Sequence, residues 1–455
     1  MGPALLWFCA YMTLGIWYVD GSLDAVADRL THPREADAQP AGPVFTAKPV
    51  VVAEASVDDQ VEPITAVPAV GGDRTKGSAL EDTCIEGTDA ACRRWAMDAF
   101  YKSVREESAG KLGRAMRVSW YGDSVIATDA IPARLRSRLQ DELGDGGPGF
   151  VYVVEPHRFC FHEDVARSHA GAWMTHAVST QQTADGLYGA GGASAEATGG
   201  ASATFKLNDG KASKVELYYL AQPKGGSAIV KANGAEVIKA DTAGDKKVAG
   251  GASATVEGGA QKFAIETRGR VRLFGIGLEN DSGAVVDNLG IVSVNVKNFF
   301  RRDEANFSAE LQHRNADLIM LMIGANEAQW LGPSDTAMRE YQGHYEKVLK
   351  MVRSARPDAT CLVVSPTDQA EAKDGGYVSR PVMPVLVEAQ RRAARATGCA
   401  FFSTYDWMGG KGSAAKWFKK GLVGSDFQHL SRKGANKFAD AVYEALMAGY
   451  KRYGH

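Results

Sequence analysis

The sequence predicts an α/β protein with a five-stranded doubly wound parallel sheet, an inserted β-sandwich and a disordered N-terminal tether. Three observations predict this fold class. Continuously apolar runs such as LIMLMI, CLVVS and AFFS alternate with amphipathic segments, as parallel strands buried on both faces require. Between residues 159 and 282 this alternation gives way to short strand-like runs separated by Gly-rich turns, which favours a sandwich. Before residue 83 no sustained period is present.

The bulk composition is that of an ordinary globular protein. The chain has 455 residues, of which 45% are hydrophobic and 23% are charged. This length suits about two to three domains of roughly 100–200 residues each, and the composition argues against wholesale disorder or several membrane spans. The formal net charge of -2 provides no general field for nucleic acid, so we expect no nucleic-acid partner.

Residues 1–20 contain an almost uninterrupted apolar run, ALLWFCAYMTLGIWYV. This run predicts a signal peptide or a membrane anchor, and therefore an exported protein that is periplasmic, on the cell surface or extracellular. No basic residue precedes the run, and its length is at the short edge of the roughly 17–25 residues that span a bilayer, so cleavage is left open. A buried core helix is the alternative. Residues 21–82, rich in Ala, Pro, Val and acidic residues, are predicted to be a disordered linker.

The cysteines suggest one disulfide and no metal site. Cys84 and Cys92 bracket a short polar segment, CIEGTDAAC, where a small loop would benefit from a covalent link. We predict a disulfide between them. Cys361 and Cys399 each lie near the start of a predicted parallel strand and are interpreted as small buried hydrophobic residues. The spacings lack the CxxC pairs of a zinc site.

The catalytic domain is predicted in two parts, residues 83–158 and 283–455, interrupted by a sandwich over 159–282. The first part has a helix over 91–107, a strand over 116–121 and an amphipathic segment over 130–143. The second part resumes at 284–296, with strands over 317–323, 360–365 and 399–404 and helices over 337–355, 380–397 and 431–450. The aromatic residues of the insert are candidates for stacking on sugar rings, although alternation in KVELYYLAQ buries every second residue. They include Trp173, Tyr188, Tyr218 and Tyr219.

Polar residues with catalytic potential follow the predicted parallel strands. Ser124 follows the first strand in a Gly-Asp-Ser turn, Gly290 lies in a Leu-Gly-Ile step, and Asn326 follows LIMLMIG. Asp426 and His429 share the loop before the final helix. Ligand sites in open α/β sheets lie beyond the carboxyl ends of the strands. These residues are therefore predicted to converge on one site.

Their chemistry fits nucleophilic catalysis without a cofactor. The Ser124 hydroxyl needs a base to take its proton, and His429 is the candidate. Asp426 would hold the imidazole of His429 and stabilise its charged form. An oxyanion would be met by the backbone N–H groups of Ser124 and Gly290 and by the Asn326 amide. The simpler alternatives are a helix N-cap for Ser124 and turn-forming roles for Asp426 and Asn326.

The sequence resembles the SGNH (GDSL-type) hydrolase family, which has a flavodoxin-like sheet. YGDSV matches the first block at Ser124, DNLGIVS the second at Gly290, IGANE the third at Asn326, and SDFQHLSRKG the last. The resemblance covers residues 116–446 without the insert, and the ordered set of blocks is far more specific than GDS alone. Two positions depart from the family: Val125 replaces the usual Leu, and Glu327 replaces the usual Asp of the third block.

A sandwich between the first and second blocks resembles the peptidoglycan O-acetylesterase branch of this family. The resemblance implies a serine esterase that hydrolyses acetyl or other short acyl esters on a cell-wall or extracellular polysaccharide through an acyl-enzyme. The partners implied are an acylated polysaccharide or peptidoglycan and, for the N-terminal segment, the membrane. Two alternatives use the same sequence. One is a polysaccharide O-acetyltransferase that excludes water, and the other is a non-catalytic polysaccharide-binding protein.

Overall fold

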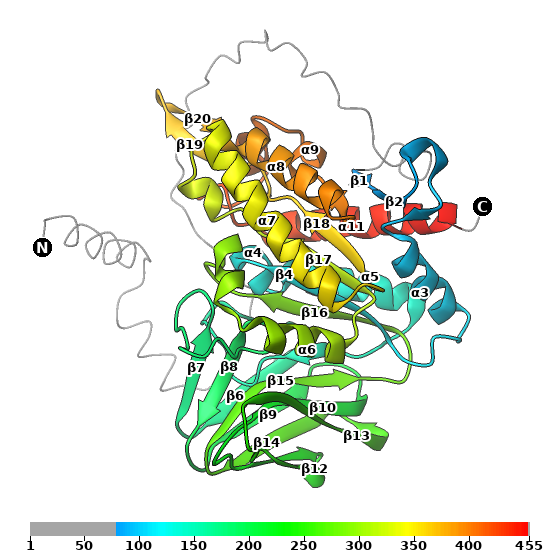
Figure 1. The fold of residues 1–455 in the computed structure, drawn as a ribbon, viewed down its shortest axis with the longest axis vertical. Helices are drawn as coiled ribbons and strands as arrows, with labels where there is room; N and C mark the ends of the chain where they lie inside the picture. Colours follow the sequence, from blue (N-terminus) through cyan, green and yellow to red (C-terminus); the bar gives the residue numbers. More distant parts are fainter. Residues whose placement is uncertain (1–78, 454–455) are drawn as a thin grey trace, which may run out of the picture. The chain divides into compact units, whose positions relative to one another are not determined.

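A computed structural model describes residues 79–453 of the chain, so the predicted N-terminal signal or anchor and most of the linker lie outside the described residues. The main sheet has the strand order β1-β21-β18-β17-β4-β16 (Figure 1). Its parallel strands are β4 (Met116–Gly122), β16 (Ala284–Gly290), β17 (Leu318–Met322), β18 (Thr360–Val364) and β21 (Ala400–Phe402). The five predicted parallel strands are thus confirmed. A short antiparallel edge strand, β1 (Leu80–Glu81), was not predicted.

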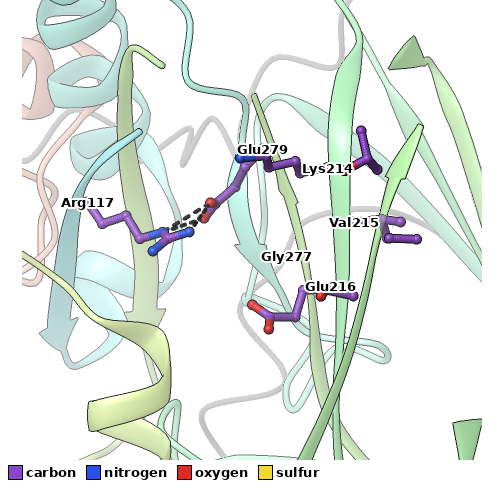
Figure 2. A pocket seen from close by; sticks show the side chains of 9 residues that line it. Arg117, Lys214, Val215, Glu216, Gly277 and Glu279 are labelled. Atoms are coloured by element: carbon purple, nitrogen blue, oxygen red, sulfur yellow. Dashed lines mark hydrogen bonds and ion pairs between the residues drawn. The ribbon is translucent and has the colours of Figure 1, made fainter. Parts of the chain in front are cut away.

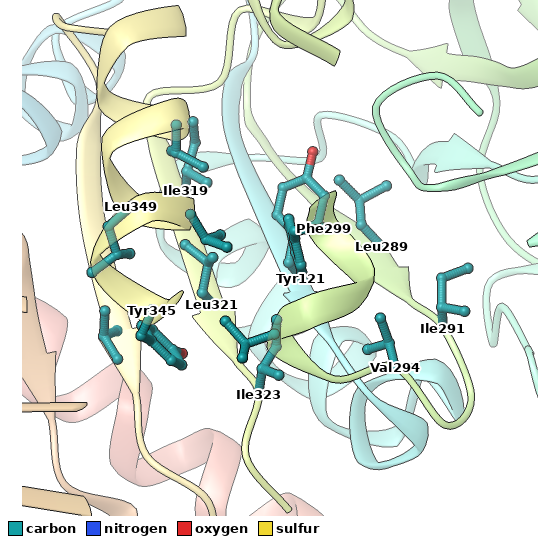
Figure 3. Packing of buried hydrophobic residues seen from close by; sticks show 14 of the residues in the cluster. Tyr121, Leu289, Ile291, Val294, Phe299, Ile319, Leu321, Ile323, Tyr345 and Leu349 are labelled. Carbon is teal, nitrogen blue, oxygen red and sulfur yellow. The ribbon is translucent and has the colours of Figure 1, made fainter. Parts of the chain in front are cut away.

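Helices cover both faces of this sheet, which confirms the doubly wound arrangement. One face carries α3 (Asp98–Ser108), α5 (Ala130–Leu143) and α11 (Arg432–Tyr453), and the other carries α6 (Glu304–Arg314), α7 (Asp335–Ala355) and α8 (Val382–Ala396). Side chains alternate along β4, so Trp120 joins the core beneath α11 while Tyr121 joins the core beneath α6 and α7. Figure 3 shows this second core, where Tyr121 lies beside Phe299 and Leu321 lies near Tyr345 of α7.

The insert forms two antiparallel sheets, in the orders β13-β10-β15-β8-β7 and β12-β11-β14-β9-β6. Side chains of both sheets form the hydrophobic core between them. The first sheet contributes Leu217 and Leu273, and the second contributes Phe205 and Phe263. The strands are β6 (Val165–Ala170), β7 (Trp173–Ala177), β8 (Ala193–Ala197), β9 (Ser202–Leu207), β10 (Ala212–Ala221), β11 (Ser227–Ala232), β12 (Ala235–Asp241), β13 (Val248–Ala260), β14 (Lys262–Arg268) and β15 (Val271–Glu279).

The sandwich packs directly against the catalytic part of the chain. Every residue of β15 is buried, because one face of its sheet meets the sandwich core and the other meets α6. Tyr218 and Phe274 of the sandwich share a hydrophobic cluster with Phe307 of α6. In addition, β5 (Gly149–Val151) lies within the predicted first catalytic part yet pairs with β15. The two parts therefore share a continuous core, which fixes the insert beside the main sheet.

A buried ion network ties the insert to the main sheet. Arg314 of α6 donates to both carboxylate oxygens of Asp287 on β16, at 2.8 and 2.6 Å. The same guanidinium lies 2.5 Å from Glu279 at the end of β15, and Glu279 also pairs with Arg117 of β4 at 2.6 Å. Burial opposes ionisation of Glu279, but Arg314 and Arg117 outweigh it and lower its pKa. A buried charge of this kind depends on its partners.

One predicted helix begins later in the structure, and one helix was not predicted. The predicted helix over 91–107 begins only at Asp98, because residues before it form the short hairpin of β2 (Cys84–Glu86) and β3 (Arg94–Trp95). Helix α6 was not predicted. Its buried face mixes Phe307 and Leu311 with Asn306, Glu310 and Arg314, so the apolar stripe by which an amphipathic helix is recognised is interrupted.

Both disulfides of the described residues lie in the catalytic part. Cys84 and Cys92 are bonded to each other, as the sequence predicts. Cys361 and Cys399 are also bonded, so their interpretation as separate buried hydrophobic residues is wrong. The reason is topological: β18 and β21 are neighbours in the sheet, which brings the starts of the two strands together.

Shorter elements surround the carboxyl edge of the main sheet. They are α4 (Ser124–Ala127), η3 (Val296–Arg301), η4 (Glu327–Gln329), β19 (Ala370–Lys373), β20 (Gly376–Ser379), α9 (Thr404–Trp407) and α10 (Ser413–Lys419), with η2 (Asp89–Ala91) near the N-terminal hairpin. Over residues 79–453 no helix combines the length and the apolar character needed to cross a bilayer.

The ion network predicts a large effect of Arg314→Leu on stability. Removing the guanidinium leaves Asp287 buried without its main partner, which should cost about 3–5 kcal/mol of unfolding free energy. The matched control is Lys297→Ala, because its ion pair with Glu340 is exposed and its loss should leave the unfolding midpoint almost unchanged. Thermal unfolding of the purified variants measures both effects. Equal midpoints for the two variants would contradict the role assigned to the network.

Candidate active site

Ser124 lies in a tight turn between β4 and α4. The cap of α4 is Asp123, whose Oδ1 accepts the Val125 N–H at 2.9 Å, so the alternative reading of Ser124 as an N-cap is wrong. A Cβ atom at Gly122 would lie 2.3 Å from the Ile126 side chain, and this close approach requires glycine. Ser124 is consequently the first residue of α4, at the end of the helix whose N–H groups point outward.

His429 reaches Ser124 from the loop that precedes α11. Its Nε2 atom lies 2.7 Å from Ser124 Oγ, across 305 residues of sequence, and its Nδ1 atom lies 2.6 Å from Asp426 Oδ2. A carboxylate can only accept, so Nδ1 carries a hydrogen and Nε2 of the neutral imidazole is free to accept the serine proton. The structure thus brings together the three residues that the sequence predicts for a Ser-His-Asp arrangement.

The loop over residues 424–429, here called the histidine loop, is held by its own hydrogen bonds. Asp426 Oδ1 accepts the backbone N–H groups of Gln428 and His429, both at 3.0 Å. The Gly424 N–H donates to the His429 carbonyl at 2.8 Å and closes the turn. Phe427, in the left-handed region with φ 55°, is buried against Tyr377 at a ring separation of 4.5 Å. Asp426 therefore orients both the loop backbone and the imidazole.

The charges of this pair reinforce each other. Burial favours the neutral imidazole of His429, but the hydrogen bond and negative charge of Asp426 outweigh burial and raise the pKa of His429 above 6.5. Burial likewise opposes ionisation of Asp426, and the hydrogen bond from His429 outweighs it and lowers the Asp426 pKa. Such a histidine is a stronger base than a free imidazole.

The three predicted oxyanion donors differ in availability. Asn326 gives one amide hydrogen to the Val294 carbonyl at 2.8 Å, which leaves the second for a ligand. The Ser124 N–H is at the open end of α4. By contrast, the Gly290 N–H donates to Asn288 Oδ1 at 3.0 Å. A Cβ atom at Gly290 would lie 2.3 Å from the Ala127 nitrogen. Only glycine therefore allows the backbone of α4 to pack this closely against the end of β16.

The loop between β16 and η3 is held from several sides. Val292 accepts a hydrogen bond from the Ser179 hydroxyl of the insert at 2.7 Å, while Val294 and Val296 are bound by the adjacent residues 326 and 327. Between Val292 and Val294, Ser293 is exposed and adopts a left-handed φ of 63°. A strained, non-glycine residue held in this way is typical of functional sites.

Glu327 is a residue to which the sequence assigned no role. It is fully buried, and its Oε1 atom accepts the Val296 N–H at 2.7 Å. Burial raises the pKa of Glu327 to about 7, and burial also raises that of Asp123 to about 6. The signal that could have found Glu327 is its position: a carboxylic acid in the turn that directly follows an apolar parallel strand is close to the buried sheet, and when buried it needs a specific partner.

One groove among the described residues lies away from Ser124. It has a volume of about 340 Å³ and is lined by residues of β4, β10, β13 and β15, among them Arg117, Lys214, Glu216, Gly277 and Glu279 (Figure 2). Arg117 is near the start of β4, whereas Ser124 follows the end of that strand. The groove is therefore at the opposite edge of the sheet, and the Arg117–Glu279 pair seen in Figure 2 belongs to the structural ion network.

Residues 251–436 match the GDSL-like Lipase/Acylhydrolase family. The matched stretch includes Asn326, Asp426 and His429, and Ser124 precedes it. The match makes the chain a carboxylic ester hydrolase.

Solved structures provide a second comparison. The chain is similar to a peptidoglycan O-acetylesterase, with a TM-score of 0.67 and 27% identity, over 78% of this chain and 96% of the other. A Corynascus thermopiles (Myceliophthora fergusii) carbohydrate esterase family 2 enzyme with a carbohydrate-binding domain gives a TM-score of 0.28 at 12% identity, over 61% of this chain and 99% of the other. No curated protein matches the chain.

The pKa of His429 predicts how the esterase activity of the chain depends on pH. This activity should fall as the pH drops through the raised His429 pKa, because only the neutral imidazole accepts a proton. Asp426→Asn removes the charge that raises this pKa, so the acid limb of kcat/KM should move to lower pH while the rate falls about 10²–10⁴-fold. Asp440→Asn, a change at a distant ion pair with Arg134, is the control. An unmoved acid limb in Asp426→Asn would contradict the coupling.

The buried contact of Glu327 yields a second prediction, about the turnover rate of the enzyme. Glu327→Ala removes the acceptor for the Val296 N–H and frees the loop that Asn326 also holds, so kcat should fall about ten- to a hundredfold with little change in KM. Glu327→Gln keeps an oxygen acceptor at this position and should retain most of the rate. Steady-state kinetics and thermal unfolding of both variants provide the measurement. A folded alanine variant with the wild-type kcat would show that the contact is dispensable.

Proposed function

We propose that this chain is a serine esterase that hydrolyses O-acetyl esters on a cell-wall or extracellular polysaccharide through an acyl-enzyme. One observation carries the proposal: the side chains of Ser124, His429 and Asp426 form a continuous chain of hydrogen bonds of 2.7 and 2.6 Å. This geometry activates a hydroxyl nucleophile and is recognised by the roles of its members, independent of fold.

In the first half-reaction, Ser124 Oγ attacks the carbonyl carbon of the ester while His429 Nε2 accepts the hydroxyl proton. Asp426 stabilises the resulting imidazolium through Nδ1. The tetrahedral intermediate collapses, the bond between the carbonyl carbon and the sugar oxygen breaks, and His429 returns the proton to that oxygen. The products of this half-reaction are the deacylated sugar and an acetyl group on Ser124.

The oxyanion of the tetrahedral intermediate requires fixed donors. The Ser124 N–H and the second amide hydrogen of Asn326 fit this role. The Gly290 N–H, the third predicted donor, would have to leave Asn288 first. We therefore favour the backbone N–H of Ser293, which is on the exposed, left-handed turn held by Asn326 and Ser179. Loss of one such donor costs about 10²–10³ in kcat in comparable sites.

In the second half-reaction, His429 activates a water molecule that attacks the acetyl-serine and releases acetate. The side chains of His429 and Asp426 are 38% and 49% exposed, so water has direct access to the acyl-enzyme. This access favours hydrolysis over transfer to a second sugar, because an acyltransferase has to keep water from the intermediate. No cofactor takes part in these steps.

The substrate class and the location are supported by similarity and by the cysteines. The similarity to a peptidoglycan O-acetylesterase extends over 78% of this chain and 96% of the other, which favours an acetylated wall polysaccharide. Two disulfides among the described residues favour an oxidising compartment such as the periplasm or the cell exterior. The apolar residues 1–20, as a signal or an anchor, would direct the protein there.

Ser124→Ala tests the proposed nucleophile directly. With 4-nitrophenyl acetate the variant should lose at least about 10³-fold in kcat, because no other hydroxyl adjoins His429 among the described hydrogen bonds. Ser253→Ala, at an exposed serine of β13, is the matched control and should behave as the unaltered protein. Equal rates for Ser124→Ala and Ser253→Ala would refute the assignment.

Product analysis separates hydrolysis from transfer. The unaltered protein is incubated with an O-acetylated polysaccharide in the presence of an unacetylated glycan acceptor, and acetate and acetyl-glycan are quantified. Hydrolysis predicts free acetate as the main product. Acetyl-glycan in excess of acetate would instead assign the chain as an O-acetyltransferase with the same nucleophile.

A further inference from the structure

The sandwich offers few aromatic faces to a glycan. Tyr188 and Tyr218, two candidates for sugar stacking, are 1% exposed and belong to a hydrophobic core. Trp173 and Tyr219 are half-buried and pack against the sandwich core. Among the aromatic side chains in residues 79–453, the exposed ones are Phe161, Phe300 and Trp330, at 42%, 41% and 56%. Two of these three are attached to the catalytic elements.

Trp330 is attached to the histidine loop. It directly follows Gln329, whose side-chain amide donates to Gln428 at 3.2 Å and also to Gln369. Gln428 immediately precedes His429. The backbone around Trp330 is fixed as well, because its N–H donates to the Glu327 carbonyl at 3.1 Å. The exposed indole of Trp330 is therefore part of a rigid segment. This segment is hydrogen-bonded to Gln428, the residue before His429.

Phe161 is attached to the element that carries the nucleophile. Its N–H donates to the carbonyl of Ala127, the last residue of α4, at 3.0 Å. Its own carbonyl accepts from the Asn288 side chain near the end of β16 at 3.3 Å. Ser124 is the first residue of the same short helix. The Ser124–His429 hydrogen bond thus joins the two elements to which Phe161 and Trp330 are anchored.

We propose that Trp330 and Phe161 form sugar-ring subsites on the two sides of the ester that Ser124 attacks. The proposal rests on the proposed function and makes it more specific, because it predicts a glycan chain of several sugars as the substrate. Sugar rings present faces of C–H groups that pack on aromatic side chains, while their hydroxyls remain in water or bind polar neighbours such as the exposed Gln329. An indole with an apolar face and a polar N–H suits this use.

Isolated exposed apolar side chains are common on protein surfaces. Three features set these two rings apart: their aromatic faces, their rigid backbone anchors and their attachment to opposite partners of the catalytic hydrogen bond. Phe300 lacks the last feature. It lies on η3 and contacts His344 within α7, at a ring separation of 5.7 Å. It is therefore a control with almost the same exposure as Phe161.

The test compares two substrates, 4-nitrophenyl acetate and O-acetylated peptidoglycan, with the full-length protein and its variants. The small ester does not reach the subsites, whereas the polymer does. The ratio of kcat/KM for peptidoglycan to kcat/KM for 4-nitrophenyl acetate should fall about tenfold in Trp330→Ala and in Phe161→Ala, the size expected for one lost aromatic contact. Trp330→Phe should recover part of this ratio, and Phe300→Ala should keep the wild-type ratio.

The outcomes distinguish this inference from the proposed function. If the unaltered protein releases acetate from peptidoglycan and Trp330→Ala and Phe161→Ala keep its ratio, the subsites are refuted and the esterase remains. If the unaltered protein cleaves 4-nitrophenyl acetate but releases no acetate from the polymer, the proposed substrate class fails, and the assignment of both rings to this glycan fails with it. A loss of ratio in Phe300→Ala equal to that in Trp330→Ala would also overturn the proposal.

Discussion

The hydrogen bond between Ser124 and His429 is the interaction on which the functional account depends. Its partners are 305 residues apart, and neither is placed by local sequence alone. Ser124 is fixed because β4 is paired on both sides, with β16 and β17, and the chain turns sharply at Gly122. His429 is fixed because its loop closes on itself before α11. The parallel sheet brings both to one edge, where carboxyl ends of neighbouring strands meet.

The insert contributes to this geometry through packing and hydrogen bonds. Its strand β15 is buried on both faces, and Arg314 and Glu279 lock that strand to the main sheet. Ser179, also from the insert, holds the loop that carries Ser293 beside Asn326. The sandwich therefore acts as a support for one wall of the site. This role explains how an insert whose tyrosines are largely buried can still matter for the catalytic site.

Most of the site was predictable because each of its residues lies in a short sequence motif, although the contacts between these motifs depend on the fold. Ser124, Asn326 and the pair Asp426 and His429 each follow a predicted strand or precede a predicted helix. What sequence could not show is which backbone donors are already in use, and Gly290 is an example because its N–H is taken by Asn288. The bond between Cys361 and Cys399 depends on strand order, and α6 is hard to recognise because polar residues interrupt its buried face. Each of these features arises from tertiary contacts.

The most direct test of the central claim is mass spectrometry of the protein after reaction with a fluorophosphonate probe, which forms a stable bond only with an activated serine. The account predicts one adduct, on the peptide that contains Ser124, and its loss when His429 is replaced by alanine. A protein that remains unlabelled, or one labelled at a different serine, would contradict the assignment of Ser124 as the nucleophile.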